Sequence, residues 1–115
     1  MATVALTSAD FDEKVGSGIA LVDFWASWCG PCMRFAPTYE RLSEKHPDIT
    51  FAKVDTEAQQ DLAIQFQISS IPTIMAIRDG VIVYSQPGAL PEQALETLIE
   101  KVRELDMDEV KAQAA

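Results

Sequence analysis

Residues 19–32 read IALVDFWASWCGPC and join two different patterns. The first seven residues are a nearly continuous apolar run, which predicts a strand buried on both faces. Cys29 and Cys32 follow after a short turn, and from there apolar residues recur at helical spacing. The segment therefore predicts a buried strand that leads directly into a helix, with two cysteines at the junction.

The flanking sequence alternates between short apolar runs and helical patterns. We expect strands at 4–7, 19–25, 49–54, 73–77 and 81–85, and helices at about 10–15, 29–46, 57–66 and 91–105. Asp79-Gly80 between the last two strands is a hairpin signal. This order predicts an α/β fold with a central mixed sheet, in which a parallel core is completed by an antiparallel hairpin and helices cover both faces.

Length, composition and charge limit what the protein can do. The 115 residues suit one domain, 1–115, although the apolar pattern weakens beyond Asp106 and we expect the tail from about residue 106 to fray. The formal net charge of −9 argues against binding to nucleic acids or to an anionic membrane face, and favours a monomer. No secretory signal and no membrane-spanning apolar stretch is visible, so we expect a cytoplasmic protein.

The two cysteines carry the chemistry. Cys29 is placed at the mouth of the predicted helix, where free backbone N–H groups and the helix dipole favour the thiolate, which is the nucleophile in disulfide exchange. Cys32 lies one turn further on, on the inward face that also holds Phe35 and Tyr39. We therefore expect an exposed attacking thiol at Cys29 and a buried resolving thiol at Cys32.

Three other interpretations of this pair stay open at this point. The cysteines could be half of a zinc site, although His46 is the only histidine and a structural site needs four ligands. They could be two inert structural thiols, or a static disulfide, which a reducing compartment disfavours. We expect no metal.

The motif resembles the active-site signature of the thioredoxin family. The resemblance rests on residues 22–32 (VDFWASWCGPC) and on three later landmarks, 71–73 (IPT), 79–80 (DG) and 88–90 (GAL), and it covers roughly residues 6–105. It implies the thioredoxin fold and the reduction of protein disulfides, because Gly30-Pro31 is similar to the dipeptide of the reducing members. An oxidase or isomerase on the same fold, and a redox-inert docking domain, are the alternatives.

The resemblance also implies a substrate site and an electron source. The Ile71–Pro72 bond would be cis, and the backbone of Ile71 would pair with an extended substrate segment. The implied substrate-binding residues are Trp28, Gly30, Pro31, Ile71, Pro72 and Gly88. Electrons would come from NADPH through a flavin-containing thioredoxin reductase, with no cofactor bound to this chain; disulfide-containing proteins would be the substrates.

Two positions depart from the family pattern. Many thioredoxins have Lys directly after the second cysteine, where this chain has Met33 followed by Arg34. Pro87 precedes Gly88, where a β-branched or small residue is common. The first departure changes the charge close to Cys29, and the second changes the backbone of the groove wall.

Three further polar residues need an interpretation, and two of them have two. Asp23 either faces water at a strand end, or is a buried acid with a raised pKa that takes the proton of Cys32, the role that the resemblance implies. Lys53 on the neighbouring strand is either its counter-ion or a surface lysine. We expect His46 to be a solvated residue at a helix end.

Overall fold

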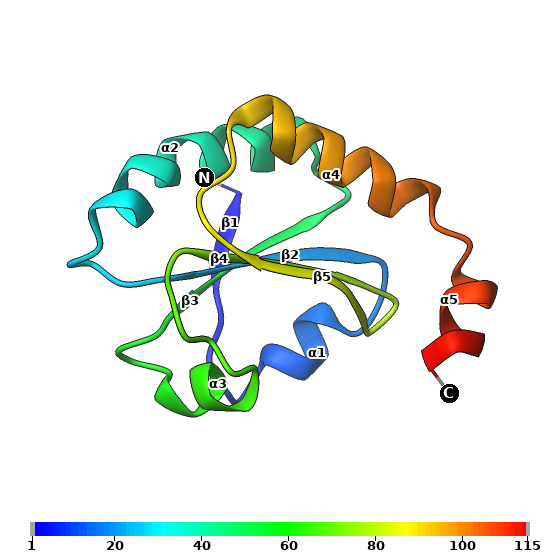
Figure 1. Cartoon of the computed structure of the whole chain (residues 1–115), viewed down its shortest axis with the longest axis horizontal. Coiled ribbons are helices and arrows are strands. Elements are labelled where there is room, and N and C mark those ends of the chain that lie inside the picture. The colour runs from blue at the N-terminus through cyan, green and yellow to red at the C-terminus, as the bar shows by residue number, and fades with distance from the viewer. Residues whose placement is uncertain (1, 115) are drawn as a thin grey trace.

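In the computed structural model, which describes residues 2–114, five strands form one mixed sheet in the order β1-β3-β2-β4-β5 (Figure 1). The elements in chain order are β1 (Thr3–Ala5), α1 (Phe11–Val15), β2 (Ile19–Trp25), α2 (Gly30–Lys45), β3 (Thr50–Asp55), α3 (Gln60–Gln65), β4 (Thr73–Arg78), β5 (Val81–Pro87), α4 (Glu92–Glu104) and α5 (Met107–Ala114). Strands β1, β3 and β2 are parallel, whereas β4 is antiparallel to both β2 and β5. The fold class predicted from the sequence is confirmed.

The central strand β2 is buried on both faces, as its continuous apolar run predicts. Figure 1 shows α2 and α4 on one side of the sheet and α1 and α3 on the other. Each helix pair closes its own core cluster, one around Phe11, Val15 and Leu62 and the other around Tyr39, Leu42 and Ile99. Residues 20–24 are therefore completely covered, and the end of β2 is a fixed platform for whatever follows it.

Helix α2 is attached to the sheet by an apolar stripe at spacings of three and four. Its buried residues include Cys32, Phe35, Tyr39 and Leu42, the inward face that the sequence predicts. The Tyr39 hydroxyl donates a hydrogen bond of 2.7 Å to the carbonyl oxygen of Ala52 in β3. This bond fixes the position of α2 along the strands, and with it the position of the cysteines.

Two turns show how local side chains set the element boundaries. Helix α3 begins at Gln60, three residues later than predicted, because Oδ1 of Asp55 accepts hydrogen bonds from the N–H groups of Glu57 and Ala58 and holds a turn there. The hairpin prediction is confirmed: Asp79 and Gly80 have φ of 53° and 79°, the positive values that a type I′ turn requires.

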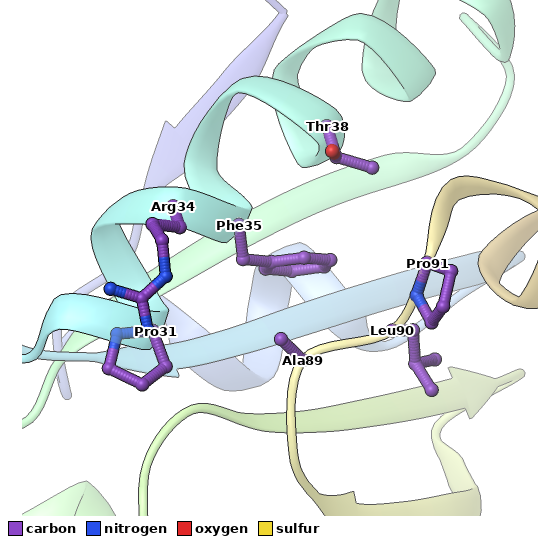
Figure 2. A pocket seen from close by; sticks show the side chains of 7 residues that line it. All are labelled: Pro31, Arg34, Phe35, Thr38, Ala89, Leu90 and Pro91. Atoms are coloured by element: carbon purple, nitrogen blue, oxygen red, sulfur yellow. The ribbon is translucent and has the colours of Figure 1, made fainter.

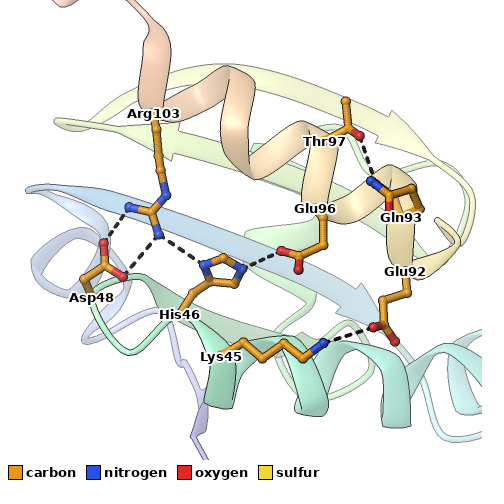
Figure 3. A network of polar contacts seen from close by, with 8 residues as sticks. All are labelled: Lys45, His46, Asp48, Glu92, Gln93, Glu96, Thr97 and Arg103. Carbon is orange, nitrogen blue, oxygen red and sulfur yellow. Dashed lines mark hydrogen bonds and ion pairs between the residues drawn. The ribbon is translucent and has the colours of Figure 1, made fainter.

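The expectation for His46 is wrong, because this residue at the end of α2 has its ring held by two side chains of α4 (Figure 3). Only 20% of the side chain is exposed, and Nε2 lies 2.5 Å from Oε1 of Glu96 in α4. Arg103, also in α4, donates to Nδ1 of His46 at 3.1 Å and pairs with Asp48. The ring is enclosed because the C-terminus of α2 packs beside α4, a tertiary contact that the sequence does not reveal.

The tail contains an element that the sequence pattern misses. Helix α5 follows Asp106, whose Oδ1 accepts hydrogen bonds from the N–H groups of Asp108 and Glu109. Met107 packs against the body of the protein with 9% of its surface exposed. The structure thus places a helix where we expect fraying, and the fraying itself stays a prediction. No helix within residues 2–114 is both long and apolar enough to cross a membrane.

The C-terminus of α4 is capped from the sheet. Nη1 of Arg78, the last residue of β4, lies 2.8 Å, 3.1 Å and 2.9 Å from the carbonyl oxygens of Val102, Arg103 and Leu105. Carbonyls at a helix end have no partner within the helix and carry the negative end of its dipole. A guanidinium there satisfies them and joins α4 to the sheet.

We expect Arg78→Met to lower the free energy of unfolding by about 1–3 kcal/mol, since hydrogen bonds to charged groups contribute roughly this much. Denaturant titration measures the change, and hydrogen exchange should quicken in the last turn of α4 before it does elsewhere. Lys101→Met removes an exposed cation from the same helix and serves as the control. Equal stability of the two variants would contradict the capping role.

Candidate active site

The two cysteines form a disulfide at the N-terminus of α2, with their Cα atoms 5.3 Å apart. Cys29 is the N-cap residue in an extended conformation, and its Sγ accepts a hydrogen bond of 3.2 Å from the backbone N–H of Cys32. Gly30 and Pro31 fill the first helical positions, where the missing N–H of proline breaks no hydrogen bond. The first turn therefore directs its N–H groups and dipole at the sulfur of Cys29.

Both cysteines are buried, so the expectation that Cys29 is exposed is wrong, whereas Cys32 is buried as expected. Cys29 is 5% exposed and Cys32 1% exposed, so Cys29 is the outer of the two without being an open surface thiol. Its Sγ lies 3.8 Å from the carbonyl oxygen of Ile71, in the loop before β4. That loop covers the sulfur, a long-range contact that spacing along the chain does not show.

The loop before β4 brings further predicted residues to the disulfide. The Ile71–Pro72 bond is cis, and the carbonyl oxygen of Pro72 accepts a hydrogen bond of 2.7 Å from the N–H of Gly88. Gly88 has φ of 110°, a conformation that glycine adopts without strain. Pro87 pairs in register with Thr73 and closes β5. Gly88 therefore lies directly beside Pro72, with Ile71 and Cys29 next to it.

Trp28 forms one flank of the site. Its side chain is 69% exposed, the largest exposed aromatic surface near the disulfide. With Ile71 and Ile68 it lines a pocket of about 300 Å³, to which Thr56, Ala63, Ser69 and Ser70 also contribute. An exposed indole beside a mostly apolar pocket is suited to contact with another protein chain.

A second pocket, of about 310 Å³, lies beside Pro31, and the sequence analysis missed it (Figure 2). It is lined by Pro31, Arg34, Phe35, Thr38, Ala89, Leu90 and Pro91. These residues come from α2 and from the segment between β5 and α4, which are far apart in the sequence. The one signal for this pocket in the sequence was Arg34, which follows Met33 at a departure from the family pattern. Met33 itself is 48% exposed.

Asp23 is completely buried, so the water-facing interpretation is wrong. Neither carboxylate oxygen has a hydrogen-bond partner among the described residues. Burial raises the pKa of Asp23 from 3.8 to about 7, and the charge of Lys53 partly opposes that rise. Asp23 is thus a buried acid that can gain or lose a proton near neutral pH.

Lys53 combines parts of both interpretations. It is paired in register with Asp23 across β2 and β3, and its charge acts on the pKa of that acid. However, no ion pair or hydrogen bond joins the two among the described residues, and Nζ of Lys53 lies 4.6 Å from the centre of the Trp25 ring. Lys53 is therefore a nearby charge rather than a direct counter-ion.

The structure describes no cluster of three or more His, Cys, Asp or Glu side chains within residues 2–114 that could hold a metal ion. The short first turn of α2 instead joins Cys29 and Cys32 to one another. The arrangement is a redox-active cysteine pair at a helix N-terminus, which directly follows the strand that carries the buried acid Asp23.

Comparison with known proteins agrees with this geometry. The sequence profile of the thioredoxin family matches residues 2–101. The chain is 55% identical over 114 residues to "Putative thioredoxin 2" of Streptomyces coelicolor, covering 98% of this chain and 85% of that protein. It is 37% identical over 102 residues to the thioredoxin of Bacillus subtilis, covering 88% and 98% respectively.

A solved structure of Plasmodium falciparum thioredoxin superimposes with a TM-score of 0.78 at 36% identity, covering 86% of this chain and 97% of that one. The family profile, the relatives and the solved structure all agree with the disulfide that lies at the N-terminus of α2. The chain therefore belongs to the thioredoxin family, and its Cys29–Cys32 pair makes it a thiol–disulfide oxidoreductase that reduces protein disulfides.

Proposed function

We propose that Cys29 is the attacking thiolate of this protein disulfide reductase, that Cys32 resolves the mixed disulfide, and that Asp23 receives the proton of Cys32. The observation that carries the assignment is the hydrogen bond from the Cys32 N–H to Sγ of Cys29 at the start of α2. The same N–H group and the helix dipole would stabilise negative charge on Cys29 once the disulfide opens.

The reaction proceeds in two exchanges that together move two electrons. The Cys29 thiolate attacks one sulfur of the substrate disulfide, that S–S bond breaks, and the departing substrate sulfur takes a proton. Cys32 then loses its proton to Asp23, and its thiolate attacks Sγ of Cys29. The S–S bond between Cys29 and the substrate breaks, the second substrate sulfur leaves as a thiolate and takes a proton from solvent, and Asp23 returns its proton to solvent. The substrate ends with two thiols and this protein with the Cys29–Cys32 disulfide.

The burial of Asp23 suits it to that proton transfer. A carboxylate with an ordinary pKa is a weak base at pH 7, whereas Asp23, with its pKa of about 7, is matched to the working pH. Lys53 keeps the pKa from rising further, since its charge favours the ionised form. We propose Lys53 as a supporting residue in this sense alone.

We propose that substrate proteins dock on the surface formed by Trp28, Gly30, Pro31, Ile71, Pro72 and Gly88. The contacts Cys29–Ile71 and Gly88–Pro72 support this, because the first brings the loop before β4 to the Cys29 sulfur and the second joins Gly88 to that loop. An extended substrate segment would lie along the Ile71 backbone as an added strand, with apolar side chains against Trp28.

Members of the family work without a bound cofactor, and they exchange disulfides with reductases and with substrate proteins in general. We propose that the electrons here come from NADPH through a flavin-containing thioredoxin reductase, and that the protein works in the cytoplasm as a monomer. The net charge of −9 supports the monomer through mutual repulsion between copies.

Cys32→Ser should accumulate a mixed disulfide between Cys29 and substrate, because the resolving thiol is gone. Cys29→Ser should accumulate none. Mass spectrometry after acid quenching identifies the adduct and its position, with the wild-type protein as control. Adducts on Cys32 in the Cys29→Ser protein would reverse the two roles.

Asp23→Asn should raise the free energy of unfolding at pH 8, by up to about 4 kcal/mol at roughly 1.4 kcal/mol for each pH unit between 3.8 and about 7. The folded chain holds the Asp23 proton to a higher pH than the unfolded chain does. Wild type therefore loses stability relative to the variant as the pH rises from about 4 to about 7, and the difference is constant above that.

The same variant should prolong the lifetime of the mixed disulfide more than it slows its formation. Denaturant titrations across pH 4–9 and quenched-flow kinetics measure the two effects. Asp12→Asn, at an exposed position of α1, is the matched control. A stability difference that does not change with pH, together with unchanged resolution, would remove Asp23 from the mechanism.

The reduction potential should be more negative than about −220 mV, on the reducing side of the glutathione pool. Equilibration with glutathione or dithiothreitol buffers measures it, and about 30 mV corresponds to a tenfold change in this two-electron equilibrium. A value near about −120 mV would assign the protein to disulfide formation instead.

A further inference from the structure

The pocket beside Pro31 contains one charged side chain, Arg34, and this cation lies at the end of a basic row along α2. Arg34, Arg41 and Lys45 are spaced by seven and four residues, so they share the side of the helix that faces α4. Glu92, in the first turn of α4, pairs with Arg41 at 2.9 Å and with Lys45 at 3.3 Å. Both oxygens of that carboxylate are thereby used.

Arg34 has no such acid. No ion pair or hydrogen bond of its guanidinium occurs among residues 2–114, and its side chain is exposed. Where an acid would complete the pattern, the facing segment supplies Ala89, Leu90 and Pro91, which carry no charge. The row is therefore matched at its far end and unmatched beside the disulfide.

The guanidinium also lies close to the disulfide turn. Its Nη1 lies 3.2 Å from the point that a Cβ on Gly30 would occupy, so it folds back over the first turn of α2. Figure 2 shows the Arg34 side chain directed toward Pro31, with the Phe35 ring and Leu90 across the hollow. Apolar walls with one cation at the rim fit a side chain that has a hydrocarbon stem and an anionic tip.

We infer that this pocket receives an acidic side chain of the substrate protein, and that Arg34 is a specificity-determining residue for acidic residues near the cysteine under attack. The stem packs against Ala89 and Leu90, with the buried Phe35 ring at the base of the pocket, and the carboxylate pairs with Arg34. Charge complementarity favours an anionic occupant. The chain as a whole has a net charge of −9, and Arg34 is an unpaired cation beside the disulfide that attracts an anionic group of the partner.

The helix geometry sets the reach. Arg34 follows Cys29 by five residues, about 7.5 Å along the axis at roughly 1.5 Å per residue, and this is an upper limit because the guanidinium folds back toward Gly30. An extended substrate advances about 3.3 Å per residue, so the acidic residue lies no more than about two positions from the substrate cysteine. Repulsion from the other acidic groups is screened beyond about 8 Å at physiological salt, which leaves the local pair to decide.

The inference rests on the disulfide-reductase function, and its test separates the two. The probes are disulfide-linked dimers of a neutral peptide with one cysteine and with Glu, Gln or Lys two residues before it, or in a second series two residues after it. The reduced protein is mixed with each dimer, and the second-order rate constant is measured by chromatography of acid-quenched samples. Wild type should reduce the Glu peptide of one series about threefold faster than the Gln peptide, with the Lys peptide slowest.

Two variants and a control assign the preference. Arg34→Ala should reduce the three peptides at similar rates, and Arg34→Glu should favour Lys over Glu. Lys14→Glu makes the same charge change on α1, across the sheet from this pocket, and should keep the wild-type order. The wild-type preference should also weaken as salt increases.

Three results would overturn the inference. Equal rates for the three peptides with wild type, or an unchanged order in Arg34→Ala, would show that Arg34 does not select acidic partners. An equal slowing of all three peptides in Arg34→Ala, with a raised pKa of the Cys29 thiol, would mean that Arg34 acts on the nucleophile instead. Failure of wild type to reduce any peptide would instead contradict the reductase function, which keeps the two outcomes distinct.

Discussion

Cys29 is both the N-terminal cap of α2 and one half of the disulfide, and the rest of the fold holds it in the position that both roles require. Its sulfur accepts the Cys32 N–H at 3.2 Å, so the group that caps the helix is the group that reacts. A cap must be held in place to work, and here it is held by β2, whose residues 20–24 are completely covered. The hydrogen bond from Tyr39 to Ala52 of β3 fixes the position of α2 along the sheet. A helix free to slide would misplace its first N–H groups, and the thiolate would lose the interaction that stabilises it.

Asp23 shows how the same platform trades stability for chemistry. An acid without a hydrogen-bond partner in a covered strand destabilises the folded state whenever it is ionised. The fold tolerates it because the acid can stay protonated up to about pH 7 and because Lys53 offers a nearby positive charge. Full pairing would have removed the destabilisation and also lowered the pKa to a range in which the group is no base. The incomplete compensation is what makes the residue useful for moving a proton.

Much of this could be predicted from the sequence, for identifiable reasons. The bounds of β2, Ile19–Trp25, follow from its continuous apolar run, and the hairpin follows from Asp79-Gly80. Both are local signals. The wrong or missing parts depend on contacts between distant segments: the ring of His46 is enclosed by α4, and Cys29 is covered by the loop at Ile71. The start of α3 was misplaced for a local reason, because the Asp55 side chain competes with the helix for backbone N–H groups. The pocket beside Pro31 could not be predicted because it also depends on contacts between distant segments: Leu90 meets α2 only in the folded chain.

The seam between α2 and α4 connects the core to the recognition of partners. At one end, His46, Glu96 and Arg103 hold the helices together. In the middle, Glu92 is matched by two cations of α2. Toward the disulfide the acids stop and the facing segment becomes apolar, so the seam opens into a pocket. A seam matched along its whole length would give only stability. Because the last cation, Arg34, is unpaired, it can pair with an acidic group of a chain that approaches the disulfide. The packing that orients α2 therefore also fixes the position of that charge.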